Sequence, residues 1–302
     1  MADMEYRGIH QTALTPADAA EFARMLHDAP GPHLGRAPVP VLVHEPGTTP
    51  AGRRGALQVV YDAIVARIGE PTLYGGSASG PSVRWRDCHR ILLLAGDAQQ
   101  VGLSVHDTLT LESEERRAFE WGGPWSGGRP YDQAFLPYVW QLDRSGPGER
   151  PTAGPGSRLA ADLVQFQYGL ELLLGAWVEQ LPVQVGTDWA SFCLTSSADR
   201  GRQLLVSYSV EDGLHASIDD RDGENNEDRA RMMLARGWQS RDRGWWQTDF
   251  PDPARQSAAA LAALVVTELY ARGTRAPEEL RARDVSCKDR GELWLPGLGI
   301  RH

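Results

Sequence analysis

Several side chains that could take part in catalysis lie on or beside strand-like runs in the first half of the chain. Arg84 and Arg86 alternate with other residues in one run, His89 follows it, and His106 ends another alternating run. If these groups faced a common cleft between two domains, they could serve an enzyme such as a lyase or hydrolase subunit. Strand periodicity equally permits them to point outward into solvent. Both interpretations stay open at this point.

The motifs of familiar enzyme classes are missing from the sequence. It contains no G-x-S-x-G, H-E-x-x-H or G-x-x-x-x-G-K-[ST] pattern. None of the eight histidines forms an i, i+4 pair with another, and the three cysteines include no C-x-x-C pair. We therefore expect no catalytic residue, no metal ligand and no cofactor. Cys88 and Cys193 lie in apolar runs, where buried and unreactive thiols are expected.

Acidic and basic side chains crowd the helix-compatible segment 112–120. Glu112, Glu114 and Glu115 precede Arg116 and Arg117. Paired carboxylates can perform acid–base chemistry, but on a helix these groups would spread around the surface. The segment therefore predicts an exposed, charged helix face.

Tryptophan is abundant, with ten in the chain, and two of them flank a glycine-rich turn. Trp121 and Trp125 stand among four glycines, and Tyr131 follows shortly after. Large aromatic rings on turns are preferred anchors for a bound polypeptide. We therefore expect Trp121, Trp125 and Tyr131 to contact a partner, together with Arg84 and Arg86. The loop would close over a ligand near the junction of two domains.

Composition narrows the class of protein without naming its function. The chain has 302 residues, of which 41% are hydrophobic and 24% charged, and its formal net charge is −9. Such a chain is globular and long enough for two domains. The negative charge argues against nucleic-acid binding, and no apolar run approaches the length of a membrane span. We expect a cytoplasmic protein without membrane contact.

A linker rich in glycine and proline divides the chain. It covers residues 146–156, so we expect one domain over 1–145 and another over 157–302. The predicted fold class is α+β, with two tandem small domains that each pack an antiparallel sheet against helices.

Helix and strand signals support this organisation. Thr15-Pro16 caps an N-terminal helix with Phe22, Met25 and Leu26 on its apolar face. A second helix over 55–68 follows an irregular segment, 30–55. The predicted strands of the first domain are 82–86, a hairpin of 89–95 with 101–106, and 135–142.

In the second domain, a long helix over 159–181 is expected to end at Pro182. Strands at 188–195, 203–210 and 214–218 follow, the last two joined by an Asp-Gly turn. A short helix over 229–235, a strand at 245–250 and a helix reaching residue 272 complete the domain.

This second half resembles the type III secretion chaperone-like domains, a group that includes YbjN-like proteins and their actinobacterial relatives. The segments that carry the resemblance are the loop Glu224-Asn225-Asn226, the helix ending Leu234-Ala-Arg-Gly-Trp238 and the strand with Trp245-Trp246. The first half resembles a more diverged copy, with 68–72 and 83–85 as its landmarks.

The resemblance implies binding rather than catalysis. Domains of this group hold a segment of another protein, so the expected function is that of a chaperone, adaptor or accessory subunit. Its partner would be a polypeptide encoded nearby: a secreted effector, a toxin or a precursor peptide presented to modifying enzymes. The alternatives are the interdomain enzyme subunit and an immunity-type toxin inhibitor. A homo- or hetero-oligomer is possible in each case.

Overall fold

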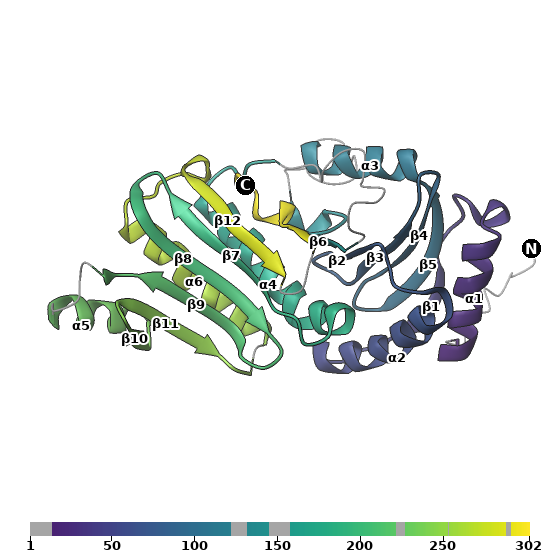
Figure 1. Ribbon diagram of the computed structural model, residues 1–302, viewed down its shortest axis with the longest axis horizontal. Coiled ribbons are helices and arrows are strands. Elements are labelled where there is room, and N and C mark those ends of the chain that lie inside the picture. Colours follow the sequence, from purple (N-terminus) through teal and green to yellow (C-terminus); the bar gives the residue numbers. More distant parts are fainter. Residues whose placement is uncertain (1–13, 122–131, 145–157, 222–226, 253, 288–290) are drawn as a thin grey trace, which may run out of the picture.

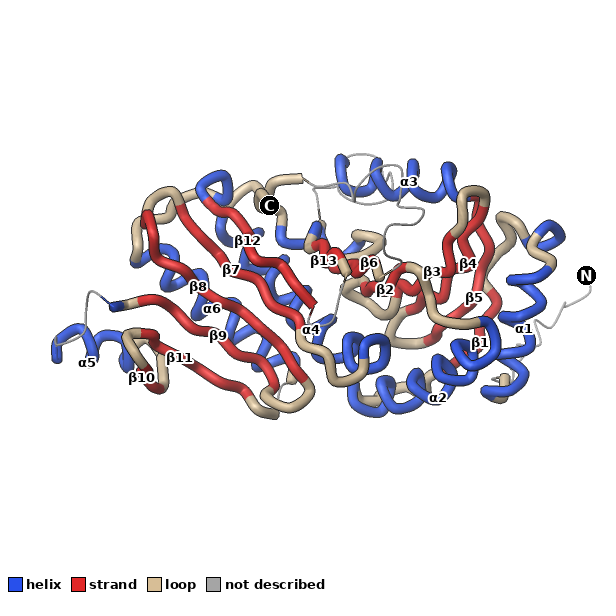
Figure 2. The backbone as a smooth tube through the Cα atoms, in the orientation of Figure 1, coloured by secondary structure: helices blue, strands red, loops and turns tan. Residues whose placement is uncertain are grey.

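The computed structural model describes residues 14–121, 132–144, 158–221, 227–252, 254–287 and 291–302. Over these residues the fold is α+β, as the sequence predicts, with six α-helices and two antiparallel sheets (Figure 1). The two sheets lie beside each other along the long axis of the molecule, with a shared helix between them (Figure 2).

The first sheet has seven strands, and its pairings are antiparallel throughout. The predicted hairpin is confirmed, because β4 and β5 pair along their length around a turn in which Asp97 accepts the backbone N–H groups of Gln99 and Gln100. In spatial order the strands are β1 (Val39–Val43), β5 (Gln100–Asp107), β4 (Arg90–Gly96), β3 (Ser82–Arg86), β2 (Leu73–Gly76), β6 (Trp140–Asp143) and β13 (Glu292–Trp294).

Helices cover both faces of the first sheet. One face packs against α1 (Pro16–Asp28) and α2 (Pro50–Ile68) in a common apolar core. On the other side, β3 is tied to α3 (Thr108–Trp121) by ion pairs. The predicted cap of α1 is present, since the Thr15 hydroxyl accepts the N–H of Asp18 at 3.2 Å.

The second sheet has six strands and is backed by helices on the face away from the viewer in Figure 1. Its Asp-Gly hairpin is confirmed, with Gly213 at φ 76°. The strands are, in order, β10 (Ser240–Asp242), β11 (Trp245–Phe250), β9 (Gly213–Asp219), β8 (Asp199–Ser209), β7 (Ala190–Ser196) and β12 (Leu280–Cys287). The helices of this half are α4 (Leu163–Val185), α5 (Glu227–Ala235) and α6 (Arg255–Ala271).

Helix α4 contributes to the packing of both sheets. Its Trp177 ring lies 5.9 Å from the ring of Phe192 on β7. Nearer its C-terminus, the Gln184 side chain reaches the first sheet, where it accepts the N–H of Gly75 and donates to the C=O of the same residue, both at 2.8 Å. Apolar residues of both halves therefore form one continuous core around this helix.

Pro182 does not end α4, so that prediction is wrong. The helix continues to Val185 and ends at Gly186. A proline inside a helix removes the N–H that would bond the carbonyl one turn earlier, here that of Val178. The guanidinium group of Arg54 on α2 donates to this carbonyl at 3.2 Å, and Arg53 beside it holds Glu179 through two bonds of 2.7 Å. A neighbouring helix thus replaces the bond that the proline removes.

The two halves are also joined by the end of the chain. Strand β13, which lies within 157–302, pairs with β6 of the first sheet. The whole of the predicted linker 146–156 lies outside the described residues. The boundaries at 1–145 and 157–302 stay predictions, and β13 crosses between them.

Several local expectations need correction. Segment 30–55 is not wholly irregular, because it contains β1 and the first turn of α2, which Thr49 caps. Cys88 is exposed in the turn between β3 and β4, whereas Cys193 is buried as expected. Met25 is exposed, and α1 instead buries Leu26 with three alanines, Ala19, Ala20 and Ala23.

The replacement bond at Val178 can be tested with a double-mutant cycle. Arg54→Ala should lower the free energy of unfolding by about 1 kcal/mol, because a carbonyl in the core helix loses its donor. In a Pro182→Ala background the N–H of Ala at position 182 supplies that bond. Arg54→Ala should then lower the free energy of unfolding by clearly less. Urea denaturation of the four proteins measures the difference. Equal costs in both backgrounds would contradict the assignment.

Candidate functional site

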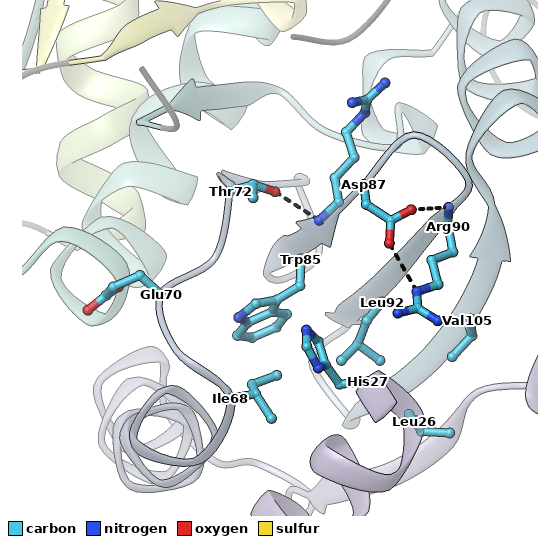
Figure 3. A pocket seen from close by; sticks show the side chains of 11 residues that line it. Leu26, His27, Ile68, Glu70, Thr72, Trp85, Asp87, Arg90, Leu92 and Val105 are labelled. Atoms are coloured by element: carbon cyan, nitrogen blue, oxygen red, sulfur yellow. Dashed lines mark hydrogen bonds and ion pairs between the residues drawn. The ribbon is translucent and has the colours of Figure 1, made fainter. Parts of the chain in front are cut away.

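A pocket of about 170 Å³ opens where α1, α2 and the β3–β4 turn meet (Figure 3). Leu26 and His27 come from the last turn of α1, Ile68 ends α2, and Trp85 lies on β3. The other lining residues are Glu70, Thr72, Arg86, Asp87, Arg90, Leu92 and Val105. An apolar cavity of about 150 Å³ is large enough for benzene. The pocket is therefore of a size to receive one aromatic or branched aliphatic group.

The floor of the pocket is apolar and held in place by the backbone. Trp85 is buried, and its indole N–H donates to the carbonyl of Gly69 at 2.8 Å. Gly69 ends α2 at φ 89°, a conformation that glycine adopts without strain. Leu26 and Leu92 are buried beside the indole ring. A ring entering this site would meet apolar surface while the indole N–H is already satisfied.

A charged turn forms one wall of the pocket. The Asp87 carboxylate accepts the backbone N–H groups of His89 and Arg90, each at 2.8 Å, and the Nε of Arg90 at 3.0 Å. Burial raises the pKa of Asp87, but these hydrogen bonds and the positive charge of Arg90 outweigh it and leave the pKa below its usual value. Asp87 therefore stays ionised near neutral pH and holds Arg90 at the pocket.

Arg84 and Arg86, two of the predicted partner-binding residues, point away from Trp85 toward α3. Arg84 makes two bonds of 2.7 Å to Glu115, its side chain is 2% exposed, and it stacks 4.8 Å from the ring centre of Tyr138. Arg86 bonds Glu112 at 2.6 Å. A partner-binding role for these arginines stays a prediction, and their buried ion pairs count against it.

These ion pairs correct the expectation of a fully exposed charged face on α3. Glu115 is buried and Glu112 is nearly so, whereas Glu114 between them is exposed. Opposite charges on β3 and α3 compensate each other in this interior position. The carboxylates act in packing a helix onto a sheet.

Of the three aromatic residues predicted to contact a partner, only Trp121 lies within the described residues. Trp121 is the last residue of α3 and is 55% exposed. Trp125 and Tyr131 lie outside the described residues, as does the loop expected to close over a ligand. The structure therefore leaves the predicted aromatic clamp untested.

The two histidines considered for catalysis occupy different settings. His89 is exposed in the β3–β4 turn. His106 is partly buried on β5, with Nε2 2.8 Å from the hydroxyl of Ser104, and burial lowers its pKa. Within the described parts of the chain, no three His, Cys, Asp or Glu side chains are grouped to hold a metal ion. No described helix is long and apolar enough to cross a membrane.

The pocket was not found from the sequence. Its parts are separated along the chain, and each has a local explanation as a helix end or a turn. One signal was available: Asp87 stands three residues before Arg90 between two strands, a spacing typical of a turn closed by an aspartate side chain. Such a turn would have placed both charges beside Trp85.

In comparisons with known proteins, the chain matches no family model, no curated protein and no solved structure. The resemblance of the second half to chaperone-like domains therefore stays a prediction.

The buried pair predicts a large loss of stability when one partner is removed. Glu115→Ala should lower the free energy of unfolding by about 3–5 kcal/mol, because the charge of Arg84 stays buried without its partner. The double variant Arg84→Met/Glu115→Leu should recover much of that loss. The matched control is Glu114→Ala on the exposed side of the same helix, with an effect within about 0.5 kcal/mol. A small effect of Glu115→Ala in guanidinium denaturation would show that the pair is not closed in solution.

Proposed function

We propose that the protein is a non-catalytic chaperone or adaptor that binds a polypeptide, and that the pocket beside Trp85 receives one apolar side chain of that partner. The observation that carries the proposal is the pocket itself, with an apolar floor, a charged wall and room for about one ring. An apolar group there would lie on Trp85 and Leu92, while the neighbouring backbone of the partner stays near polar groups. The proposed partner is a secreted effector, a toxin or a precursor peptide.

The edges of both sheets are poor places for a partner strand. The edge strand β1 contains Pro40 and has an irregular register between Pro40 and Leu42. At the other sheet, β12 carries the exposed Arg281 and Arg283 and is irregular beyond Arg283. The remaining edge strands, β13 and β10, have three residues each. Prolines, bulges, charges and short strands all disfavour pairing with another chain, so a pocket supports polypeptide binding better than strand addition does.

One side chain in this pocket cannot hold a partner by itself. Burying a leucine or phenylalanine side chain gains about 1.5–3 kcal/mol, which is less than the roughly 4 kcal/mol that a millimolar Kd requires. Tight binding therefore requires further contacts, and the net charge of −9 favours a partner with basic residues elsewhere along its length. The pocket would then fix the register of the partner rather than supply all of its affinity.

Filling the pocket tests the proposed function. Short Gly/Ser peptides that carry a single Phe, Leu or Ala are titrated into the protein, and the indole N–H signal of Trp85 is followed by NMR. Phe and Leu peptides should shift this signal and the Ala peptide should not. Ile68→Trp places a ring at the pocket and should weaken Phe-peptide binding at least fivefold, with little change in melting temperature.

The matched control is Val59→Trp, which adds the same side chain to an exposed position of the same helix. It should leave peptide binding unchanged. Equal binding of Phe and Ala peptides, or full binding by Ile68→Trp, would refute the assignment of this pocket.

A further inference from the structure

Several hydrogen-bond acceptors around the pocket are already engaged. Thr72 donates its hydroxyl to the carbonyl of Arg84 and accepts the N–H of Arg86. One oxygen of the Glu70 carboxylate accepts the hydroxyl of Tyr74 at 2.9 Å, and Glu70 lies at the edge of the group of lining residues in Figure 3. The oxygens of Asp87 hold two backbone N–H groups and Arg90. A ligand that brings only donors would find few partners here.

Hydrogen-bond donors, in contrast, are available from Arg90, in the charged turn that forms the wall opposite Trp85. Arg90 uses its Nε for Asp87, and its side chain is 38% exposed. The two terminal NH₂ groups of the guanidinium have no hydrogen bond to the described residues. Figure 3 shows the Arg90 guanidinium across the pocket from Trp85 and Ile68, with the His27 ring between them. The Arg90 guanidinium therefore offers hydrogen-bond donors to a ligand, and it faces the apolar floor of the pocket.

We propose that the pocket binds the C-terminal residue of a polypeptide, with its apolar side chain on Trp85 and its carboxylate on the terminal NH₂ groups of Arg90. This inference rests on the proposed polypeptide-binding function and adds which part of the partner is bound. Only the last residue of a chain joins an apolar side chain to a carboxylate on the same carbon. An internal residue offers a neutral amide in that place, and Asp or Glu lacks the apolar group.

The contact between Asp87 and Arg90 prepares the guanidinium for this role. Asp87 is itself fixed by the N–H groups of His89 and Arg90, so it orients Arg90 without depending on the ligand. A guanidinium group has five N–H donors in a planar fork and can bind a second carboxylate through two parallel bonds. Because Arg90 is already oriented, less side-chain freedom is lost on binding. His27, near the middle of the pocket, can add a donor when its ring N–H points inward.

The decisive comparison uses two small probes that differ only in charge. N-acetyl-phenylalanine carries the free carboxylate, and N-acetyl-phenylalanine amide replaces it by a neutral group of the same shape. Both are titrated into the full chain, with the Trp85 indole N–H as reporter. The acid should bind about tenfold more tightly than the amide, as a charge-assisted bond requires. High salt should reduce this difference.

Variants of Arg90 assign the preference to its side chain. Arg90→Gln should remove the acid preference, and Arg90→Lys should keep part of it because the charge remains without the fork. The control Arg231→Gln removes an exposed arginine on α5 and should change nothing. Melting curves show which variants fold, and equal binding of acid and amide by the unsubstituted chain would overturn the proposal without any variant.

The outcomes separate this inference from the function on which it rests. Equal binding of acid and amide, or an acid preference that survives Arg90→Gln, would overturn recognition of the C-terminus and leave an apolar pocket. Absence of binding by both probes, together with no response to the Phe and Leu peptides, would overturn the polypeptide-binding function as well.

Discussion

The burial of α4 is the constraint on which the rest of the structure depends. Polar groups of a helix placed between two sheets are stabilised when they bond protein partners, because water does not reach them. Gln184 does so with the backbone of Gly75, and Arg54 does so with the carbonyl that Pro182 leaves unpaired. Each partner belongs to the first half of the chain. The interior polar groups of α4 therefore determine how the first sheet and α2 are placed against the second half.

The candidate pocket follows from this placement. Helix α2 is held to α4 near its start by Arg53 and Arg54, and it ends at Gly69, whose carbonyl fixes Trp85. Successive side chains of β3 point to opposite faces of the first sheet. Trp85 faces the apolar side and forms the pocket floor, while its neighbours on either side face α3 and bind carboxylates there. One strand thus supplies a binding surface and a buried ion-pair ladder.

Local signals predicted much of the fold. Capping residues, Asp-containing turns and alternating runs located α1, the β4–β5 and β8–β9 hairpins and β11, because those features depend on neighbours in the sequence. The errors have a different origin. Pro182 continues a helix because a distant arginine replaces its bond, and Glu115 is buried because its partner lies on a strand. The pocket also needs two helix ends and a turn together, which no short stretch of sequence encodes.

The return of the chain end to the first sheet has a consequence for synthesis. Leu142 on β6 pairs with Leu293 on β13, about 150 residues later, so closing this contact fixes a very long loop. On the ribosome, this edge of β6 stays open until residues 292–294 have emerged. Contacts between such distant residues slow folding and leave edges exposed for longer. A protein that we propose to bind another polypeptide therefore passes through a stage in which its own unpaired strand needs protection.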